Sequence, residues 1–342
     1  MSGKKLIVVT DWLRPFLEVR REGLYCPALD LYVDPYLPAP RTLLSHAHAD
    51  HAVAGHGEIW ATAETIAFYR CRHPDWSGAA RNIAYETPVE AGGLTLEAFP
   101  SGHILGAAQW RFSAGNESLL YTGDFRRGPS RTAPPIVTPG ARVLLTEATF
   151  GLPVFRFPPR VEIEEQLVSS CRDAFAAGET PVLLAYALGK AQEVAILLGS
   201  AGIPCVLHGA AWKLLPDYEM AGYFFPLSRA YESGPVTPGE ALIVPPRCAR
   251  TPIVQKLKSR RVLYLSGWAV RAASRTELDA DVLLPFSDHS DFTELLEHVA
   301  QVAPERVVTH HGFAESFAKI LRQKGIEATV LEETSERPAE ED

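Results

Sequence analysis

The hexapeptide at residues 46–51 reads His-Ala-His-Ala-Asp-His and holds four side chains that could bind metal ions. It follows an apolar segment with the character of a strand that runs into a loop. Its first two histidines are two positions apart, so an extended backbone would direct both imidazoles to one side. The aspartate and the last histidine would point to a second locus beside the first. Imidazole together with carboxylate suits zinc, iron or manganese better than calcium. A polar loop with scattered histidines is the disfavoured alternative, because His/Asp clusters of this density rarely lack a metal.

Three further candidate ligands, His103, Asp124 and His311, each follow an apolar segment later in the chain. In α/β proteins, strand ends deliver such side chains to one edge of a sheet. Two metals about 3.5–4 Å apart need a bridging group and an activated water, and Asp124 is the candidate bridge. The other ligands divide into two sets, one formed by His46, His48 and His103, and one formed by Asp50, His51 and His311.

This pattern, HxHxDH followed by a later His, Asp and His, resembles the signature of the metallo-β-lactamase fold hydrolases over most of residues 24–330. The resemblance implies two divalent metal ions, with zinc as the first candidate and manganese as the alternative. It also assigns Asp34, which ends an apolar run, to the support of the ligands, a role that matters nearly as much as ligation.

Four segments resemble the β-CASP branch of that fold, whose members are nucleases that process DNA and RNA. Residues 146–151 are similar to its acidic motif, residues 285–291 to its histidine motif, and residues 309–312 to its last motif. Residues 185–193 resemble the helix start that opens the inserted cap domain. This segment is not a P-loop, because its lysine lacks the following Ser or Thr and the earlier glycine.

The resemblance also implies roles for individual residues. His289 becomes the general acid, and Glu147 holds it in the required tautomer and raises its pKa. These two residues and Asp50 form the expected catalytic set. In the last motif the histidine directly before glycine is the ligand, which favours His311 over His310.

Length narrows the resemblance within the branch. Ribonuclease J and the pre-mRNA cleavage endonucleases are longer, and Artemis-like enzymes lack the last histidine. The chain looks most like the bacterial exonucleases associated with a DNA ligase and a helicase, which implies DNA as substrate and a role in DNA repair. A ribonuclease of the same branch is the main alternative. A small-molecule hydrolase would need neither the Glu147–His289 pair nor a cap, and a scaffold without activity would not need seven ligand candidates.

Composition limits the class of protein. The chain has 342 residues, of which 46% are hydrophobic, enough for one large domain or two of ordinary size. No apolar run reaches the roughly 18 residues of a membrane span. Five scattered cysteines without a CxxC pair indicate reduced thiols rather than a disulfide framework. We therefore expect a cytoplasmic protein with no membrane partner.

Charge is distributed unevenly along the chain, whose formal net charge is −8. The terminal segment 332–342 holds six acidic residues against one arginine. Residues 247–275 hold eight basic residues and no acidic one, which indicates either a solvated face or a track for phosphates. Two arginines directly after Asp124 could also hold phosphates, and a tryptophan in the basic segment could stack on a base. The candidate nucleic-acid contacts are Arg126, Arg127, Arg250, Lys256, Lys258, Arg260, Arg261 and Trp268.

The resemblance implies an αββα sandwich interrupted by a small α/β cap, and the order of strands and helices predicted from hydrophobic periodicity fits it. Residues 162–177 have apolar positions at helical spacing, whereas 94–99 and 118–121 have the character of strands. Strands at 261–266 and 281–284 are expected to return to the first half. The predicted division is 1–160 and 269–331 for the metallo-β-lactamase domain, 161–268 for the β-CASP cap, and 332–342 for an acidic disordered tail.

Overall fold

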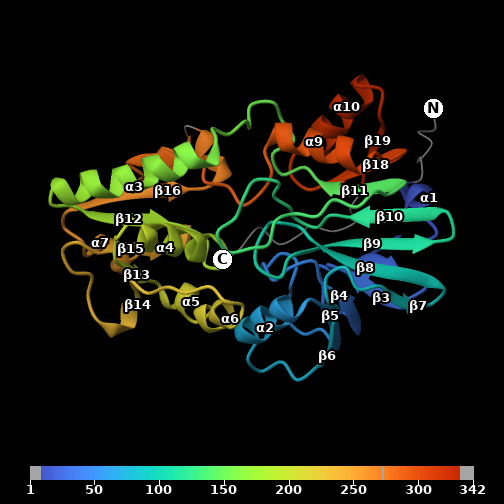
Figure 1. Cartoon of the computed structure of the whole chain (residues 1–342), viewed down its shortest axis with the longest axis horizontal. Coiled ribbons are helices and arrows are strands. Elements are labelled where there is room, and N and C mark those ends of the chain that lie inside the picture. The colour runs from blue at the N-terminus through green and yellow to red at the C-terminus, as the bar shows by residue number, and fades with distance from the viewer. Residues whose placement is uncertain (1–8, 272, 332–342) are drawn as a thin grey trace.

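The computed structural model describes residues 9–271 and 273–331, which form a mixed α/β fold with three β-sheets (Figure 1). The expected α/β class is confirmed. The acidic segment 332–342, expected to be a disordered tail, lies outside the described residues. Within the described ranges, no helix has the length and apolar character needed to span a membrane.

The first two sheets are built from the regions on either side of the predicted cap. The first sheet has six strands in sequence order: β1 (Glu18–Arg20), β2 (Gly23–Cys26), β3 (Leu31–Val33), β4 (Arg41–Leu43), β5 (Glu58–Ala61) and β6 (Ala79–Asn82). The second has seven, in the order β19 (Glu327–Val330), β18 (Arg306–His310), β11 (Val143–Glu147), β10 (Glu117–Tyr121), β9 (Ala108–Ala114), β8 (Leu94–Pro100) and β7 (Val89–Ala91).

Strand direction in the second sheet brings the ligand loops together. Strands β10, β11 and β18 are parallel neighbours, and β8 runs in the same direction because both β8 and β10 are antiparallel to β9. Their carboxyl ends therefore meet at one edge of the sheet. His103, Asp124 and His311 each lie just beyond one of these strand ends, and Glu147 is the last residue of β11.

An apolar core lies between these two sheets and fixes their relative position. Leu31 and Val33 of β3 are buried in it, together with Leu96 of β8 and Phe112 of β9. The alternating burial along β8 shows why a period-two pattern identified this strand. Each such side chain contributes about 1.5–3 kcal/mol when it leaves water.

Helices cover the outer faces of the two sheets. Helices α9 (Phe292–Val302) and α10 (Ala314–Gln323) share a second apolar cluster with strands β10, β11 and β18 of the second sheet, and α2 (Ala63–Arg72) packs with β5 of the first. Helix α9 begins with a capping box, in which the Asp291 carboxylate accepts from Glu294 N and the Glu294 carboxylate accepts from Asp291 N, both at 2.9 Å. This capping box fixes the chain two residues after His289.

The third sheet and its helices α3 to α8, called the cap below, lie beside the first two sheets (Figure 1). All six strands are parallel, in the order β14 (Ser228–Ala230), β13 (Cys205–Leu207), β15 (Ala241–Val244), β12 (Thr180–Leu184), β16 (Arg260–Leu265) and β17 (Val282–Leu284). The helical elements of the cap are α3 (Arg160–Ala176), α4 (Lys190–Ser200), α5 (Gly209–Trp212), α6 (Leu215–Met220), α7 (Pro252–Gln255) and α8 (Ala273–Leu278). Three short 3-10 helices at Tyr231–Ser233, Pro246–Cys248 and Gly267–Val270 belong to the same region, and α1 (Val9–Leu13) precedes β1.

One expectation about the cap is wrong. We expected the strands at 261–266 and 281–284 to return to the first half, but β16 and β17 pair with each other in parallel inside the third sheet. Short apolar runs of this kind do not reveal which sheet a strand joins, because parallel strands are buried on both faces. Strand β17 therefore extends this sheet beyond residue 268, the predicted end of the cap.

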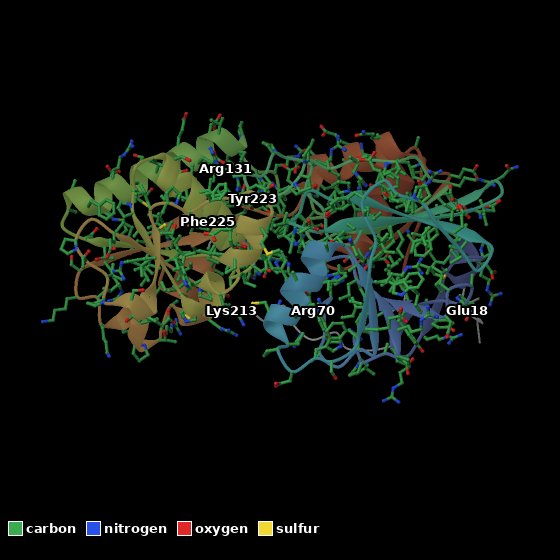
Figure 2. The ribbon with its side chains drawn as sticks, turned by 60° about the horizontal axis from the view of Figure 1, so that its bottom comes forward. Glu18, Arg70, Arg131, Lys213, Tyr223 and Phe225 are labelled. Carbon is green, nitrogen blue, oxygen red and sulfur yellow. The ribbon has the colours of Figure 1, made fainter. Side chains whose placement is uncertain are left out.

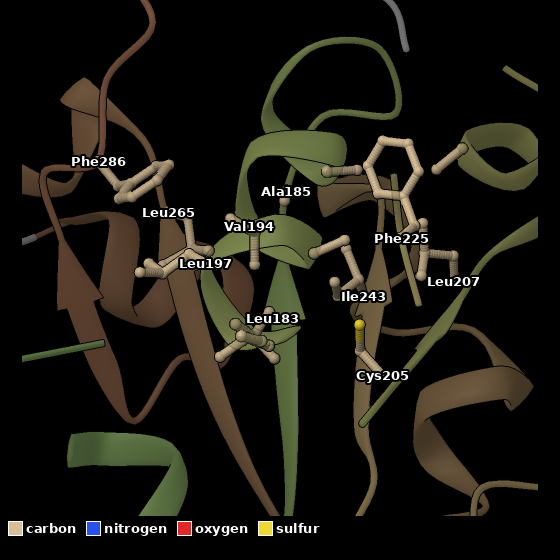
Figure 3. Close-up of a cluster of buried hydrophobic side chains, with 14 of the residues drawn as sticks. Leu183, Ala185, Val194, Leu197, Cys205, Leu207, Phe225, Ile243, Leu265 and Phe286 are labelled. Carbon is tan, nitrogen blue, oxygen red and sulfur yellow. The ribbon is translucent and has the colours of Figure 1, made fainter. Parts of the chain in front are cut away.

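The core of the cap reaches into the metal-binding loops. Figure 3 shows Leu183, Val194 and Leu265 among the side chains packed between the third sheet and α4. The same cluster includes Ala47 and Ile104, which lie next to the predicted ligands. The cap and the metal loops are therefore joined by continuous apolar packing.

Candidate metal centre and active site

Six of the seven predicted ligands, from separate loops, lie in one largely buried cluster, and His311 is not among these six. Two overlapping groups have ligand atoms close enough to hold a metal ion, and a third group contains the predicted acid. The three groups are His46, His48, His103 and Asp124; His46, Asp50 and His51; and Asp124, Glu147 and His289.

The first group places four ligand atoms around a common point. Nε2 of His103 lies 3.0 Å from Nδ1 of His48. Oδ2 of Asp124 lies 3.5 Å from Nε2 of His46 and 3.9 Å from Nε2 of His103. The four side chains therefore converge, and their ligand atoms all lie within 4.8 Å of one another.

The second group lies beside the same Asp124 oxygen. Nε2 of His51 lies 3.5 Å from this oxygen and 3.5 Å from Oδ2 of Asp50. The His311 ring lies parallel to the His51 ring, with centroids 5.4 Å apart, whereas His310 stacks on Tyr121. This placement favours His311 over His310 as the further ligand, and Asp124 faces both groups as a bridge would.

Asp34 supports the second group from inside the first two sheets. Its carboxylate lies 2.8 Å from Nδ1 of His51 and accepts hydrogen bonds from the hydroxyls of Tyr121 and Ser45 and from Ser45 N. Because Nδ1 of His51 is held in this way, Nε2 is left to face the metal position. Gly123 makes the close approach of these loops possible, since a Cβ there would lie 2.5 Å from Ser45 Cβ.

Backbone carbonyls perform the same task for two histidines of the first group. Nε2 of His48 lies 3.1 Å from the Leu188 carbonyl, and Nδ1 of His103 lies 2.8 Å from the Asp288 carbonyl. Each imidazole thereby donates one N–H to a fixed oxygen and directs its other nitrogen toward the centre.

The electrostatics of the cluster fit divalent cations. Nε2 of His46 and Nε2 of His51 are buried and have no hydrogen-bond partner among the described residues. Burial lowers the pKa of His46 and of His103 well below the usual range, which keeps both rings in the neutral form that binds metals. His51 differs, because nearby carboxylates, Asp124 first, overcome the effect of burial and raise its pKa to about 10. A metal would displace that proton.

Glu147 and His289 form a pair beside the ligand cluster. Both carboxylate oxygens of Glu147 lie 3.1 Å from Nδ1 of His289, and the same carboxylate accepts from Phe125 N at 2.8 Å. Burial alone would lower the pKa of His289, but the carboxylates of Glu147 and Asp124 raise it well above its usual range. With Nδ1 facing Glu147, Nε2 is the ring atom left to move a proton.

One narrow cavity joins the ligands to His289 and to the cap. Metal-centre residues and His289 share it with aromatic and polar cap residues. The cavity is lined by His48, Ala49, Asp50, Asp124, Phe150, Tyr186, Lys190, Ser266, Gly267, Trp268, Asp288 and His289.

The candidate nucleic-acid contacts are spread over the molecule rather than gathered at this cavity. Trp268 lines the cavity and packs against Phe150. Arg126 does not, since its buried guanidinium pairs with Glu193 of α4 at 2.9 Å. Arg127 also has a partner within the protein, because its guanidinium donates a solvent-exposed hydrogen bond to Oε1 of Gln301 at 2.9 Å.

The remaining basic candidates lie away from the metals or on the surface. Arg260 and Arg261 begin β16, at the opposite end of the strand from the cavity-lining segment, and Arg261 pairs with Glu179 at 2.7 Å. The side chains of Arg250, Lys256 and Lys258 are exposed.

Comparisons with known proteins show relatives of two kinds. The chain is 37% identical over 322 residues to a probable DNA ligase of Opitutus terrae, an alignment that covers 92% of this chain and 31% of that protein. It is 30% identical over 189 residues to cleavage and polyadenylation specificity factor subunit 3 of Dictyostelium discoideum, covering 46% and 24% of the two chains. An RNase J-like protein of Methanocaldococcus jannaschii is 28% identical over 191 residues, covering 46% and 43%.

These relatives agree with the resemblance read from the motifs. The chain belongs to the β-CASP branch of the metallo-β-lactamase fold family. It spans less than half of the length of each of these relatives. No family model matches the sequence. A crystal structure of a protein of unknown function from Enterococcus faecalis shares the fold, with a TM-score of 0.60 at 13% identity, covering 86% of this chain and 80% of that one.

Sequence reasoning missed several residues of this β-CASP site. Lys190 was considered only as part of a segment that is not a P-loop, and Asp288 only as a neighbour of His289. Tyr121 and Ser45 were not recognised as partners of Asp34. The Gly189-Lys190 step at the expected start of a cap helix was the one available signal for Lys190.

Proposed function

We propose that this β-CASP protein is a two-metal phosphodiesterase that cleaves DNA as an exonuclease in DNA repair. The observation that carries this proposal is the Glu147–His289 pair, whose histidine lines one cavity with residues of the Asp124-centred ligand cluster. A metallo-hydrolase of small molecules would need the ligands but not a buried carboxylate–imidazole pair beside them. The αββα sandwich with an inserted β-CASP cap is the architecture proposed to carry this site.

The residues divide the chemistry among themselves. When bound, two divalent ions, zinc or manganese, would polarise the phosphate and lower the pKa of an attacking water. His46, His48 and His103 would hold one ion, Asp50, His51 and His311 the other, and Asp124 would contact both. Glu147 orients His289, whose Nε2 donates a proton to the leaving oxygen. The aromatic residues Phe150 and Trp268 line the same cavity and would contact the bound substrate.

Relatedness favours DNA over RNA as the substrate. The relative that aligns with 92% of this chain is named as a probable DNA ligase. Functional partnership with a DNA ligase and a helicase is part of the same proposal, and the five free cysteines fit a cytoplasmic location. An RNA-processing role is the second candidate, favoured by the similarity to the cleavage and polyadenylation subunit and to the RNase J-like protein.

The test is a cleavage assay with four matched substrates. Protein reconstituted with zinc or manganese is incubated with end-labelled single- and double-stranded DNA and RNA of one sequence. Progressive release of mononucleotides from DNA supports the proposal. Cleavage confined to RNA would support the second candidate. Absence of cleavage of all four by protein that contains both metals would contradict nuclease function.

The path of the bound DNA strand can be tested with variants near the two ends of the β-strand β16. Trp268→Ala should weaken binding of single-stranded DNA, because base–aromatic stacking contributes about 1–3 kcal/mol per base. Replacement of Arg260 and Arg261 by Glu should weaken binding less and flatten its dependence on salt, since Arg261 already pairs with Glu179. Fluorescence anisotropy at several salt concentrations measures both. A larger loss from the arginine replacements would place the strand along the far end of the cap sheet.

A further inference from the structure

Two carbonyl oxygens that orient metal ligands belong to segments attached to the cap. Leu188, whose carbonyl holds His48, lies in the turn that precedes α4. Asp288, whose carbonyl holds His103, follows β17 of the third sheet. The first metal group therefore depends on two segments that are separate in sequence and must be kept in register with each other.

A buried ion pair joins these two segments. Nζ of Lys190, two residues after Leu188, lies 3.1 Å from Oδ1 of Asp288. The Lys190 side chain is 1% exposed and that of Asp288 is 7% exposed. The ammonium also lies 4.4 Å from the centroid of the Tyr186 ring, which adds a cation–π contact.

Such a pair is not explained by stability alone. Desolvation of two charges can exceed their attraction, so a buried ion pair is weak evidence for a gain in stability. Both residues line the cavity that contains His48 and His289. The pair therefore fits a role in setting the geometry of the site.

The turn before α4 is also built for close approach to the metal loops. Gly189 has φ +89°, and a Cβ at this position would lie 2.3 Å from Cγ2 of Ile104, the residue after His103. Gly189 N donates to the Gln192 side chain at 2.8 Å, which fixes the turn from within the helix. A side chain larger than hydrogen would push the turn away from the His103 loop.

We propose that the Lys190–Asp288 pair positions the Leu188 and Asp288 carbonyls against His48 and His103. It thereby sets the affinity of the ion held by His46, His48 and His103. Lys190 and Asp288 are positioning residues, because they act through the ligands. The inference rests on the proposed two-metal centre. The affinity for the ion at Asp50, His51 and His311 should not depend on the Lys190–Asp288 pair, because His51 is held by Asp34 instead.

The test measures the affinity of each ion separately. Lys190→Met removes the charge and keeps the length of the side chain, and Asp288→Asn keeps the backbone carbonyl. The double variant removes both charges and avoids an unpaired buried charge, so it keeps the test valid if a single variant fails to fold. Zinc is withdrawn with a competing chelator, and cobalt-substituted protein reports changes in the ligand geometry through its visible spectrum. We expect one of two ions to bind about 10–100-fold more weakly, the size of effect typical for the loss of a ligand's outer partner.

A second cap ion pair provides the matched control. Arg229 and Glu240 are 2.6 Å apart in the cap, and neither lines the cavity of the metal centre. The double variant Arg229→Met, Glu240→Gln should bind both ions as the unaltered protein does. The unfolding midpoint of each double variant in metal-free form, compared with that of the unaltered protein, shows whether the cap remains folded in that variant.

The possible outcomes separate the inference from the proposed function. If the unaltered protein binds no metal, the proposed function fails. If it binds two ions and the Lys190 and Asp288 variants bind both with unchanged affinity, the positioning role is overturned. Equal weakening of both ions would also overturn it, because the pair would then support the fold as a whole.

Discussion

The two halves of the candidate metal centre are supported in different ways. His51, in the half with Asp50 and His311, is held by a carboxylate, Asp34, that belongs to the first two sheets. His48 and His103, in the other half, are held by carbonyls of segments attached to the cap. His51 is therefore oriented from within the first two sheets, whereas His48 and His103 are oriented from segments attached to the cap.

The largest effect is expected where the two halves meet. Asp124→Ala should lose both ions, because one Asp124 oxygen lies 3.5 Å from histidines of both groups. Elemental analysis of protein purified without chelator should fall from about two transition-metal ions per chain to none. Retention of one ion would show that Asp124 serves only one half, and retention of both would reject its assignment.

The acid should be separable from both halves. His289→Ala should retain the metals and lose cleavage by about 10²–10⁴-fold, the usual contribution of a general acid. A substrate with an activated leaving group should be affected much less, because it does not need the proton. His289 also belongs to a group with Asp124 and Glu147 that could hold a metal. Loss of an ion from the variant would make His289 a ligand instead of the acid.

Asp34→Asn should lower the affinity for the ion at Asp50, His51 and His311. Lys190→Met should instead lower the affinity for the ion at His46, His48 and His103. The new amide presents a donor where the Asp34 carboxylate now faces His51, Ser45 and Tyr121. We expect about a 10–100-fold loss of affinity for the ion at His51, measured by the same chelator competition. Weakening of the same ion by both variants would contradict the independent support of the two halves.

A smaller contrast concerns a buried histidine outside both halves. His298 packs against Phe125 with ring centroids 4.2 Å apart, and burial, aided by Arg127, lowers its pKa to about 3. Below pH 6.5, His298 becomes protonated in the unfolded chain but stays neutral in the folded protein. The free energy of unfolding should therefore fall by up to about 1.4 kcal/mol per pH unit between pH 6.5 and 3.

The variant His298→Leu tests this pH dependence. The measurement uses metal-free protein, because acid would otherwise release bound metal and change the stability as well. Its free energy of unfolding, from urea titrations between pH 7 and pH 4.5, should depend less steeply on pH. The same slope in both proteins would mean that other groups dominate the acid sensitivity.

Local patterns were sufficient for several elements. Apolar positions at helical spacing predicted the helix found as α3, and short apolar runs between turns predicted β8 and β10 within a residue or two of their ends. The pairing of β16 with β17 was not predictable in this way, because sheet membership depends on contacts between residues far apart in the chain.

By itself, the sequence predicted the ligand types and their order, because imidazoles and carboxylates at strand ends have few other uses at such density, and its resemblance to the β-CASP motifs predicted the Glu147–His289 pair. It did not determine how each imidazole is oriented. Every residue type has a backbone carbonyl, so the sequence does not indicate that those of Leu188 and Asp288 contact the histidines. Only the tertiary structure shows that Lys190 meets Asp288, and that carbonyls of segments attached to the cap contact His48 and His103.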